Sequence, residues 1–210
     1  MNKIVIAGCG PGHEDYVSVL AQKAVAQAEV LIGAQHLLDL FPQVGCQRIV
    51  VRGSMAVILE KMAALANKKI CVLVSGDTGL FSLARLVVKR FGRNNCQLIP
   101  GISSVQVAFA RLALAWSDAL LISAHGRIPQ INTAELAHYD KIALLAGDDA
   151  AVRWAADRLT ELGTDYVAIS CENLTLATEE IREFSDAESL RQDSLPVRTI
   201  LLLLKKELLL

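Results

Sequence analysis

Short apolar runs alternate with helix-forming patterns along the first half of the chain. Most of these runs lack polar alternation, which is typical of strands buried on both faces of a parallel sheet. Between them, apolar residues recur at the spacing of an amphipathic helix. This alternation predicts an α/β fold with a mainly parallel sheet. The expected strands are Ile4–Ala7, Val30–Ile32, Arg48–Val51, Ile70–Ser75 and Gln97–Ile99.

The same pattern predicts the helices between these strands. The first helix is expected to start near Glu14, with a buried face that runs to Ala28. Another has its apolar face from Leu80 to Phe91 and is expected to stop at Gly92, since glycine is common just after helix ends. Further helices are expected near His36–Leu40, after Ser54 and after Ser104.

The second half of the chain has a different pattern. Leu114–Asp118 interrupts the alternation, so we predict two α/β domains, residues 1–115 and 116–210. Thr178–Phe184 alternates polar and apolar residues, which favours a half-exposed antiparallel strand and hence a mixed sheet. The other strands of this domain are expected at Ala119–Ser123, Lys141–Leu145, Tyr166–Ser170 and Val197–Leu204, with helices after Asn132, across Val152–Leu162 and at Asp186–Arg191.

Composition narrows the class of protein. The chain has 210 residues, 53% of them hydrophobic and 20% charged, which allows a large core. A net charge of −1 argues against a nucleic-acid partner held by bulk electrostatics. No apolar run is long enough to span a membrane, and the first is too short for a signal peptide. The five scattered cysteines, none in a C-x-x-C pair, indicate reduced thiols in the cytoplasm and no metal centre.

Candidate chemistry gathers where the expected strands end. In open α/β sheets ligands bind at the carboxyl ends of the strands, and Ser75–Gly79 follows a central strand there. Its alternative role is a plain turn, with Asp77 or Thr78 as a helix cap. Ser103 and Ser104, after the last strand, are equally compatible with binding and capping. The loop after the first strand, GCGPG, is not a dinucleotide fingerprint, because His13 stands where glycine is needed.

Taken together, these loops resemble one family. The succession of GCGPG (8–12), SGD (75–77) and PGISS (100–104) before a second α/β half is similar to the tetrapyrrole methylases, the class III S-adenosylmethionine-dependent methyltransferases. Residues 100–127, which end in HGR, and CENL (171–174) resemble the stand-alone C(5)-methylating subfamily of corrin biosynthesis. The resemblance covers nearly the whole chain.

The resemblance implies a fold and a set of site residues. The family fold has two α/β domains with S-adenosylmethionine in the cleft between them, usually in a homodimer. It implies no metal bound by the protein itself. Arg127, Gly10 and Gly12 are expected at the tetrapyrrole substrate, and His125 is a candidate base, although either His125 or Arg127 could also be an ordinary loop residue. The residues expected at the methyl donor are Pro11, Gly76, Asp77, Leu80, Ser103, Ser104, Ala146 and Leu174.

Three positions bear on the resemblance. Thr78 stands where the family usually has proline after SGD, and Asp15-Tyr16-Val17 stands where leucine-threonine is usual. Gly33-Ala34-Gln35 lacks the aspartate that the uroporphyrinogen methylases carry there, which agrees with the C(5) subfamily. The implied reaction is methylation of C5 of cobalt-precorrin-7 to give cobalt-precorrin-8, with a separate protein as C(15)-methyltransferase and decarboxylase. The alternatives are a methylase of the same fold with another substrate, such as diphthine or ribosomal RNA, and a non-catalytic binding module.

Overall fold

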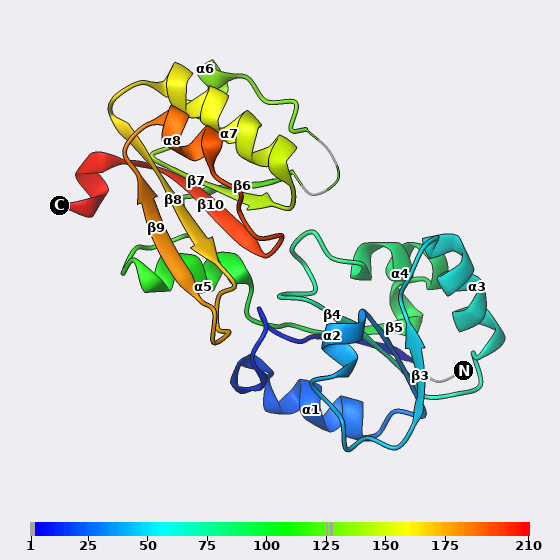
Figure 1. The fold of residues 1–210 in the computed structure, drawn as a ribbon. Helices are drawn as coiled ribbons and strands as arrows, with labels where there is room; N and C mark the ends of the chain where they lie inside the picture. Colours follow the sequence, from blue (N-terminus) through cyan, green and yellow to red (C-terminus); the bar gives the residue numbers. More distant parts are fainter. Residues whose placement is uncertain (1–2, 125, 127) are drawn as a thin grey trace. The chain divides into compact units, whose positions relative to one another are not determined.

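The chain folds into two α/β units, residues 1–103 and 104–210, in a computed structural model that describes residues 3–124, 126 and 128–210 (Figure 1). The expected boundary at residue 115 lies further along the chain, after helix α5 (Ser104–Arg111). This helix belongs to the second unit because Val105, Ala108 and Phe109 are fully buried and the helix packs beside strand β10 (Thr199–Lys205).

The first unit contains a five-stranded parallel sheet in the order β3-β2-β4-β1-β5. The apolar runs form these strands as expected, and β4 and β1 lie in the middle, where their residues are buried on both faces. All five strands point the same way, so their carboxyl ends lie along one edge. The strands are β1 (Ile4–Gly8), β2 (Val30–Gly33), β3 (Gln47–Val50), β4 (Ile70–Val74) and β5 (Cys96–Ile99).

Helices cover both faces of this sheet. Alternate residues of each strand enter opposite cores, so that Ile6 and Val72 pack on one side, and Ala7 and Leu73 on the other. The first core includes residues of α3 (Met55–Ala64) and α4 (Ala84–Phe91), and the second includes residues of α1 (Val19–Ala26) and α2 (Gln35–Leu38).

Two helices begin later than the periodicity predicts. Glu14–Tyr16 is a separate 3₁₀ turn (η1), Val17 is extended, and α1 starts only after Ser18, whose hydroxyl oxygen accepts a 3.2 Å hydrogen bond from the Ala21 amide. Helix α4 starts at Ala84, because Phe81 has a positive φ of 46° that no α-helix accommodates. The residues in front of both helices are therefore loop, at the edge of the sheet that carries the candidate motifs.

The second unit has a mixed sheet in the order β6-β7-β10-β8-β9. Strands β6 and β7 are parallel, whereas β10 runs antiparallel to both of its neighbours and β9 antiparallel to β8. The half-exposed antiparallel strand expected from its alternation is β9. The strands are β6 (Leu120–Ser123), β7 (Lys141–Ala146), β8 (Tyr166–Glu172), β9 (Glu180–Phe184) and β10.

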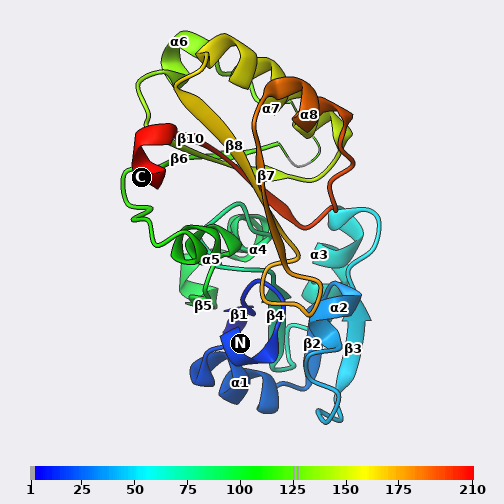
Figure 2. The same cartoon turned by 60° about the vertical axis from the view of Figure 1, so that its left-hand side comes forward.

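Three helices lie over one face of this sheet and α5 lies against the other (Figure 2). They are α6 (Thr133–Leu136), α7 (Asp149–Leu162) and α8 (Ala187–Gln192). The Asn132 side chain caps α6 by accepting a 2.9 Å hydrogen bond from the Glu135 amide, as the sequence predicts. Within the described residues no helix is long and apolar enough to cross a bilayer.

Candidate functional site

Three loops of the first unit meet at one edge of its sheet. They follow β4, β1 and β5, which are neighbours in the sheet and parallel, so that their carboxyl ends lie side by side. The loops carry the GCGPG, SGD and PGISS motifs. The parallel topology therefore brings together three motifs that lie far apart in the sequence.

The centre of this edge is built from glycine backbone. A Cβ on Gly101 would lie 2.3 Å from the carbonyl oxygen of Gly76 and 2.8 Å from the Gly8 backbone. A Cβ on Gly8 would lie 2.6 Å from the Gly101 nitrogen. Such separations are shorter than any real Cβ contact, so no side chain fits at either position.

The loop after β1 is hydrogen-bonded to the loop after β4. The Gly76 amide donates to the Gly10 carbonyl at 2.8 Å, and the Gly10 amide donates back to Gly76 at 3.4 Å. Gly10 has a φ of 73°, and a Cβ there would lie 2.8 Å from the Tyr16 carbonyl oxygen. Gly10 is buried, whereas Pro11 and Gly12 beside it are half-buried and form the accessible part of this loop.

Asp77 ties the loop after β4 to the loop after β5. Its Oδ1 accepts a 2.7 Å hydrogen bond from the Gly79 amide, and its Oδ2 accepts one of 3.1 Å from the Gly101 amide. Asp77 does not cap α4, which begins at Ala84. In this structure its carboxylate holds the loops after β4 and β5 together.

The remaining first-unit candidates differ in exposure. Leu80 is half-buried, whereas Thr78 and Ser103 are buried. The Thr78 carbonyl accepts a 2.6 Å hydrogen bond from the Ser82 hydroxyl. Ser104 is the first residue of α5 and belongs to the second unit. Leu80, Ser103 and Ser104 are the residues of this group that are expected at the methyl donor, and that role stays a prediction.

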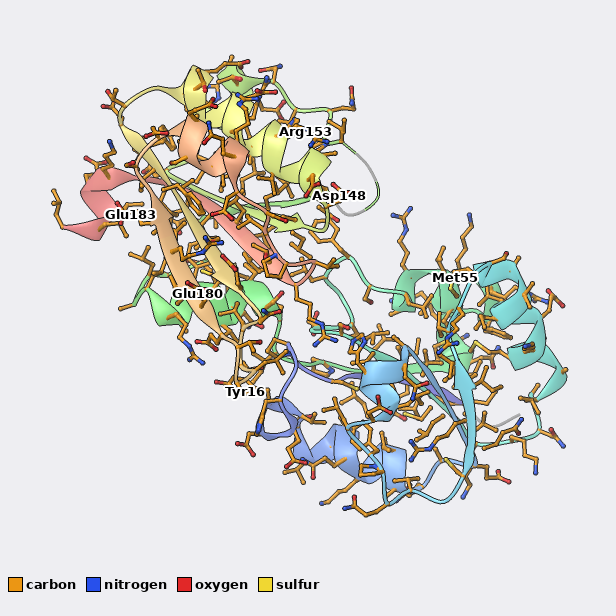
Figure 3. All side chains as sticks on the ribbon, viewed as in Figure 1. Tyr16, Met55, Asp148, Arg153, Glu180 and Glu183 are labelled. Atoms are coloured by element: carbon orange, nitrogen blue, oxygen red, sulfur yellow. The ribbon has the colours of Figure 1, made fainter. Side chains whose placement is uncertain are left out.

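A hollow of about 300 Å³ opens beside these loops within the first unit. It lies between the 3₁₀ turn that contains Tyr16, labelled in Figure 3, and the start of the PGISS loop. Its lining is mostly apolar. The residues that line it are Asp15, Tyr16, Val17, Ser18, Pro100, Gly101 and Ile102.

One residue at this edge was missed by the sequence analysis. The Nε2 atom of His36, in α2, lies 3.3 Å from the Ser75 hydroxyl oxygen, and Ser75 directly precedes Gly76. The sequence analysis assigns His36 no role, because 39 residues separate the two partners and only the β2–β4 pairing brings them together.

The second unit has a corresponding edge. Thr199, the first residue of β10, is aligned with Ala146 at the end of β7 and with Glu172 at the end of β8. Ala146 and Leu174, the two residues expected from this unit at the methyl donor, are buried, with 6% and 4% of their surface exposed. Both therefore lie on the strand-end side of one sheet.

The glutamate of CENL is the buried centre of a partly exposed charge network. The Oε1 atom of Glu172 accepts hydrogen bonds from the Ser170 hydroxyl at 2.6 Å and from Nη2 of Arg182 at 2.7 Å. Arg182 also donates to Asp193 at 2.6 Å. Asp193 first, and Glu172 after it, raise the pKa of the Arg182 guanidinium. Arg182 and Asp193 have no motif in the sequence, so nothing there pointed to them.

Two candidates lie outside the described residues: His125, the candidate base, and Arg127, the candidate substrate contact.

The acidic residues after β7 lie at the N-terminus of the helix that follows. The Asp148 side chain accepts a 2.9 Å hydrogen bond from the Ala151 amide and caps α7; Figure 3 labels Asp148 at the start of this helix and Arg153 further along it.

The charged side chains of these three loops suit a cationic methyl donor better than an anionic ligand. The loops 9–13, 75–83 and 100–103 contain no lysine or arginine and include Asp77. A sulfonium group therefore meets no like charge from these loops. No group of three His, Cys, Asp or Glu side chains suited to a metal ion occurs in the described part of the chain.

Comparison with known proteins identifies the class. Residues 3–188 match the family model described as Tetrapyrrole (Corrin/Porphyrin) Methylases. The family comprises S-adenosylmethionine-dependent C-methyltransferases with the two-sheet fold described above. The chain belongs to this family.

Individual relatives are more specific. The chain is 30% identical over 179 residues to the cobalt-precorrin-7 C(5)-methyltransferase of Salmonella typhimurium, which covers 85% of this chain and 88% of the relative. A crystal structure of precorrin-6Y methylase from Archaeoglobus fulgidus matches with a TM-score of 0.73 at 26% identity, covering 98% of each chain. A uroporphyrin-III C-methyltransferase from Thermus thermophilus, complexed with S-adenosylhomocysteine, shares the fold, with a TM-score of 0.80 at 16% identity over 97% of each chain.

Proposed function

We propose that the chain transfers a methyl group from S-adenosylmethionine to C5 of cobalt-precorrin-7. The observation that carries the proposal is the 30% identity to a cobalt-precorrin-7 C(5)-methyltransferase across 85% of the chain, which includes both units. The strand-end loops support it independently, because three of them are bound together through glycine backbone and carry no cationic side chain.

The methyl donor is proposed to bind at the strand-end loops of both units. From the first unit come Pro11, Gly76, Asp77, Leu80 and Ser103. Ser104, Ala146 and Leu174 come from the second. Backbone amides and carbonyls at such loops can recognise the edges of adenine and ribose, while apolar side chains enclose the rings.

Methyl transfer from a sulfonium requires little acid–base catalysis. The bound donor supplies an already activated methyl group on a sulfonium. The task of this chain is to hold the nucleophilic macrocycle carbon in line with the methyl–sulfur bond and to exclude water. Afterwards a proton must leave C5, and we propose His125 as the group that accepts it, since an unperturbed imidazole has a pKa of about 6.5. Arg127 is proposed to pair with a substrate carboxylate, together with substrate contacts from Gly10 and Gly12.

Binding of the donor product is the first test. We expect wild-type protein to release or absorb heat with S-adenosylhomocysteine and to melt at a higher temperature in its presence. Ser104→Phe should weaken this binding without unfolding the protein. Ser54→Phe is the matched control, because Ser54 lies at the N-terminus of α3 as Ser104 lies at that of α5, is exposed and makes no side-chain capping bond. A wild-type protein that gives neither heat nor a shift favours the non-catalytic module.

The product is the second test. We propose one methyl transfer per macrocycle, with no methylation at C15 and no decarboxylation by these 210 residues, and a separate C(15)-methyltransferase and decarboxylase in the pathway. Purified protein should convert cobalt-precorrin-7 and [13C-methyl]S-adenosylmethionine to a product heavier by one labelled methyl, with the label at C5 by NMR. Loss of carbon dioxide, or label at C15, contradicts the proposal; an inert macrocycle favours a different methyl acceptor.

We further propose a homodimer in the cytoplasm. The mean hydropathy of the chain is +0.39, and several apolar side chains of the first unit are exposed, among them Val19 at 64% and Leu20 at 56%. Exposed apolar surface of this kind is commonly covered in a symmetric interface. Light scattering at micromolar concentration should report twice the chain mass of 22.7 kDa, and a clean monomer contradicts the dimer.

A further inference from the structure

The loop that connects β8 to β9 carries two residues in an unfavourable backbone conformation. Asn173 has a φ of 47° and Thr175 a φ of 71°. Asparagine tolerates the left-handed conformation, whereas it is costly for a β-branched residue such as Thr175. Leu174, between them, is only 4% exposed. The loop must therefore be held by other contacts for Leu174 to keep its position.

Glu179 supplies one of these contacts. Its Oε2 atom accepts a 2.5 Å hydrogen bond from the Thr175 amide, so the carboxylate fixes the left-handed residue directly. The backbone adds two 3.0 Å hydrogen bonds, from the Leu176 amide to Asn173 and from the Glu179 amide to Leu176. Glu179 is thus bonded to Thr175 through its side chain and to Leu176 through its backbone amide. It lies next to Glu180, which Figure 3 labels at the start of β9.

Arg111 holds Glu179 in turn. As the last residue of α5, it donates from Nε to Oε1 at 2.6 Å and from Nη2 to Oε2 at 3.1 Å. This two-point geometry fixes the plane of the carboxylate and aims Oε2 at the Thr175 amide. The Arg111 hydrogen bond is the largest cause that lowers the pKa of Glu179, followed among the lowering causes by that of the Thr175 amide. Arg111 belongs to the stretch 100–127, and through Glu179 it is linked to Thr175, the residue that directly follows CENL.

We infer that Arg111 and Glu179 are positioning residues that hold Leu174 in the conformation that binds the methyl donor. This inference rests on the proposed function, because it takes Leu174 as part of the donor site. Neither residue needs to touch the reacting atoms. Without the carboxylate, the loop can leave its left-handed conformation, and only the fraction of molecules that keeps it binds the donor. Affinity falls in proportion to that fraction, so a loop that is native one-tenth of the time binds about tenfold more weakly.

The variants Arg111→Ala and Glu179→Ala test this directly. We expect each to raise the dissociation constant of S-adenosylhomocysteine about tenfold and the KM for S-adenosylmethionine equally, with kcat within about twofold of wild type. Arg191→Ala is the matched control: its Nη2 is 2.8 Å from Asp157, and its side chain is 36% exposed, as is that of Arg111. It should lower the melting temperature to a similar extent but leave binding unchanged.

Glu179→Gln provides a second readout, which also covers the case that the alanine variants do not fold. The amide keeps an oxygen for the Thr175 amide but loses the charge, so its affinity should lie between those of wild type and Glu179→Ala. Hydrogen exchange of the Thr175 amide should follow the same order and should be unaffected by Arg191→Ala.

Two outcomes separate the inference from the proposed function. If the wild type binds S-adenosylhomocysteine and all the Arg111 and Glu179 variants bind it with the same affinity, the inference alone is overturned. A loss of kcat at constant KM in these variants overturns it as well. Absence of binding by the wild type overturns the proposed function, and the inference with it.

Discussion

The strand-end edges of the two units are held together by different means. In the first unit most of the described contacts involve backbone: Gly8, Gly76 and Gly101 touch without side chains, and the Asp77 carboxylate accepts from two backbone amides. In the second unit the corresponding contacts are between charged side chains, around Glu172 and Glu179. The first edge is thus sensitive to added volume, and the second to lost charge and to pH.

The comparison shows why motifs mark the first edge so well. A position that admits only glycine leaves a visible signature in a sequence, as in GCGPG and PGISS. A charge pair can be supplied by residues from several elements, so it leaves no fixed pattern. The edge of the second unit was accordingly recognised through CENL and Ala146, whereas Arg182 and Asp193 were missed.

The largest effect is expected from adding one carbon at the first edge. Gly101→Ala places a Cβ 2.3 Å from the Gly76 oxygen, so the loops after β4 and β5 must separate, at a cost of more than about 4 kcal/mol of unfolding free energy. Gly45→Ala is the control, because a Cβ there meets nothing within 4 Å, and its effect should stay within about 0.5 kcal/mol. Urea denaturation measures the free energy of unfolding of both variants. Equal values would contradict the close approach of Gly101 to Gly76.

A smaller effect is expected from removing a cation at the second edge. Arg182→Ala leaves Glu172, whose side chain is 5% exposed, without its counter-charge and should cost about 2–3 kcal/mol. Lys68→Ala breaks an exposed pair, Lys68–Glu29 at 3.5 Å, and should leave the melting temperature close to that of wild type. If calorimetry gives the two variants the same melting temperature, the Glu172 network does not stabilise this edge.

The smallest effect is a pH dependence of the Arg111–Glu179 pair. Because the folded-state pKa of Glu179 is below its ordinary value of 4.5, its contribution is present above pH 4.5 and is lost as the pH falls through the folded-state value. Arg111→Ala should therefore be less stable than wild type by about 1.5 kcal/mol at pH 7, which agrees with the roughly tenfold weaker donor binding expected of the same variant. The difference should shrink below pH 4.5; urea titrations at a series of pH values measure it, and a constant difference argues against the pair.

The sequence predicted the architecture because the hydrophobic patterns of strands and of amphipathic helices are both strong in it. Central strands such as β4 are uninterrupted apolar runs, and β9 was recognised as half-exposed from its alternation. Helix starts were predicted less well. Apolar spacing continues through Leu80 into α4 although Phe81 turns the chain left-handed, and a local periodicity carries no information about φ.

The side chains that support the candidate site could be predicted only in part. Gly76, Asp77 and Gly101 lie within contiguous motifs, so their neighbourhood was expected. His36, Arg111, Glu179 and Arg182 act through partners brought to them by sheet order or by a turn. A single sequence reports which residues are adjacent along the chain, whereas these pairs depend on which strands become neighbours.

The position of β1 has a consequence for synthesis on the ribosome. The first strand of the chain lies between β4 and β5, the last two strands of its sheet to be made. At roughly 5–20 residues per second, the nascent chain carries β1 without either neighbour for several seconds. Arresting translation before Cys96 should leave the first unit open to protease, whereas arrest well beyond Ser103 should protect it, so this unit needs protection for as long as β1 lacks its two neighbours.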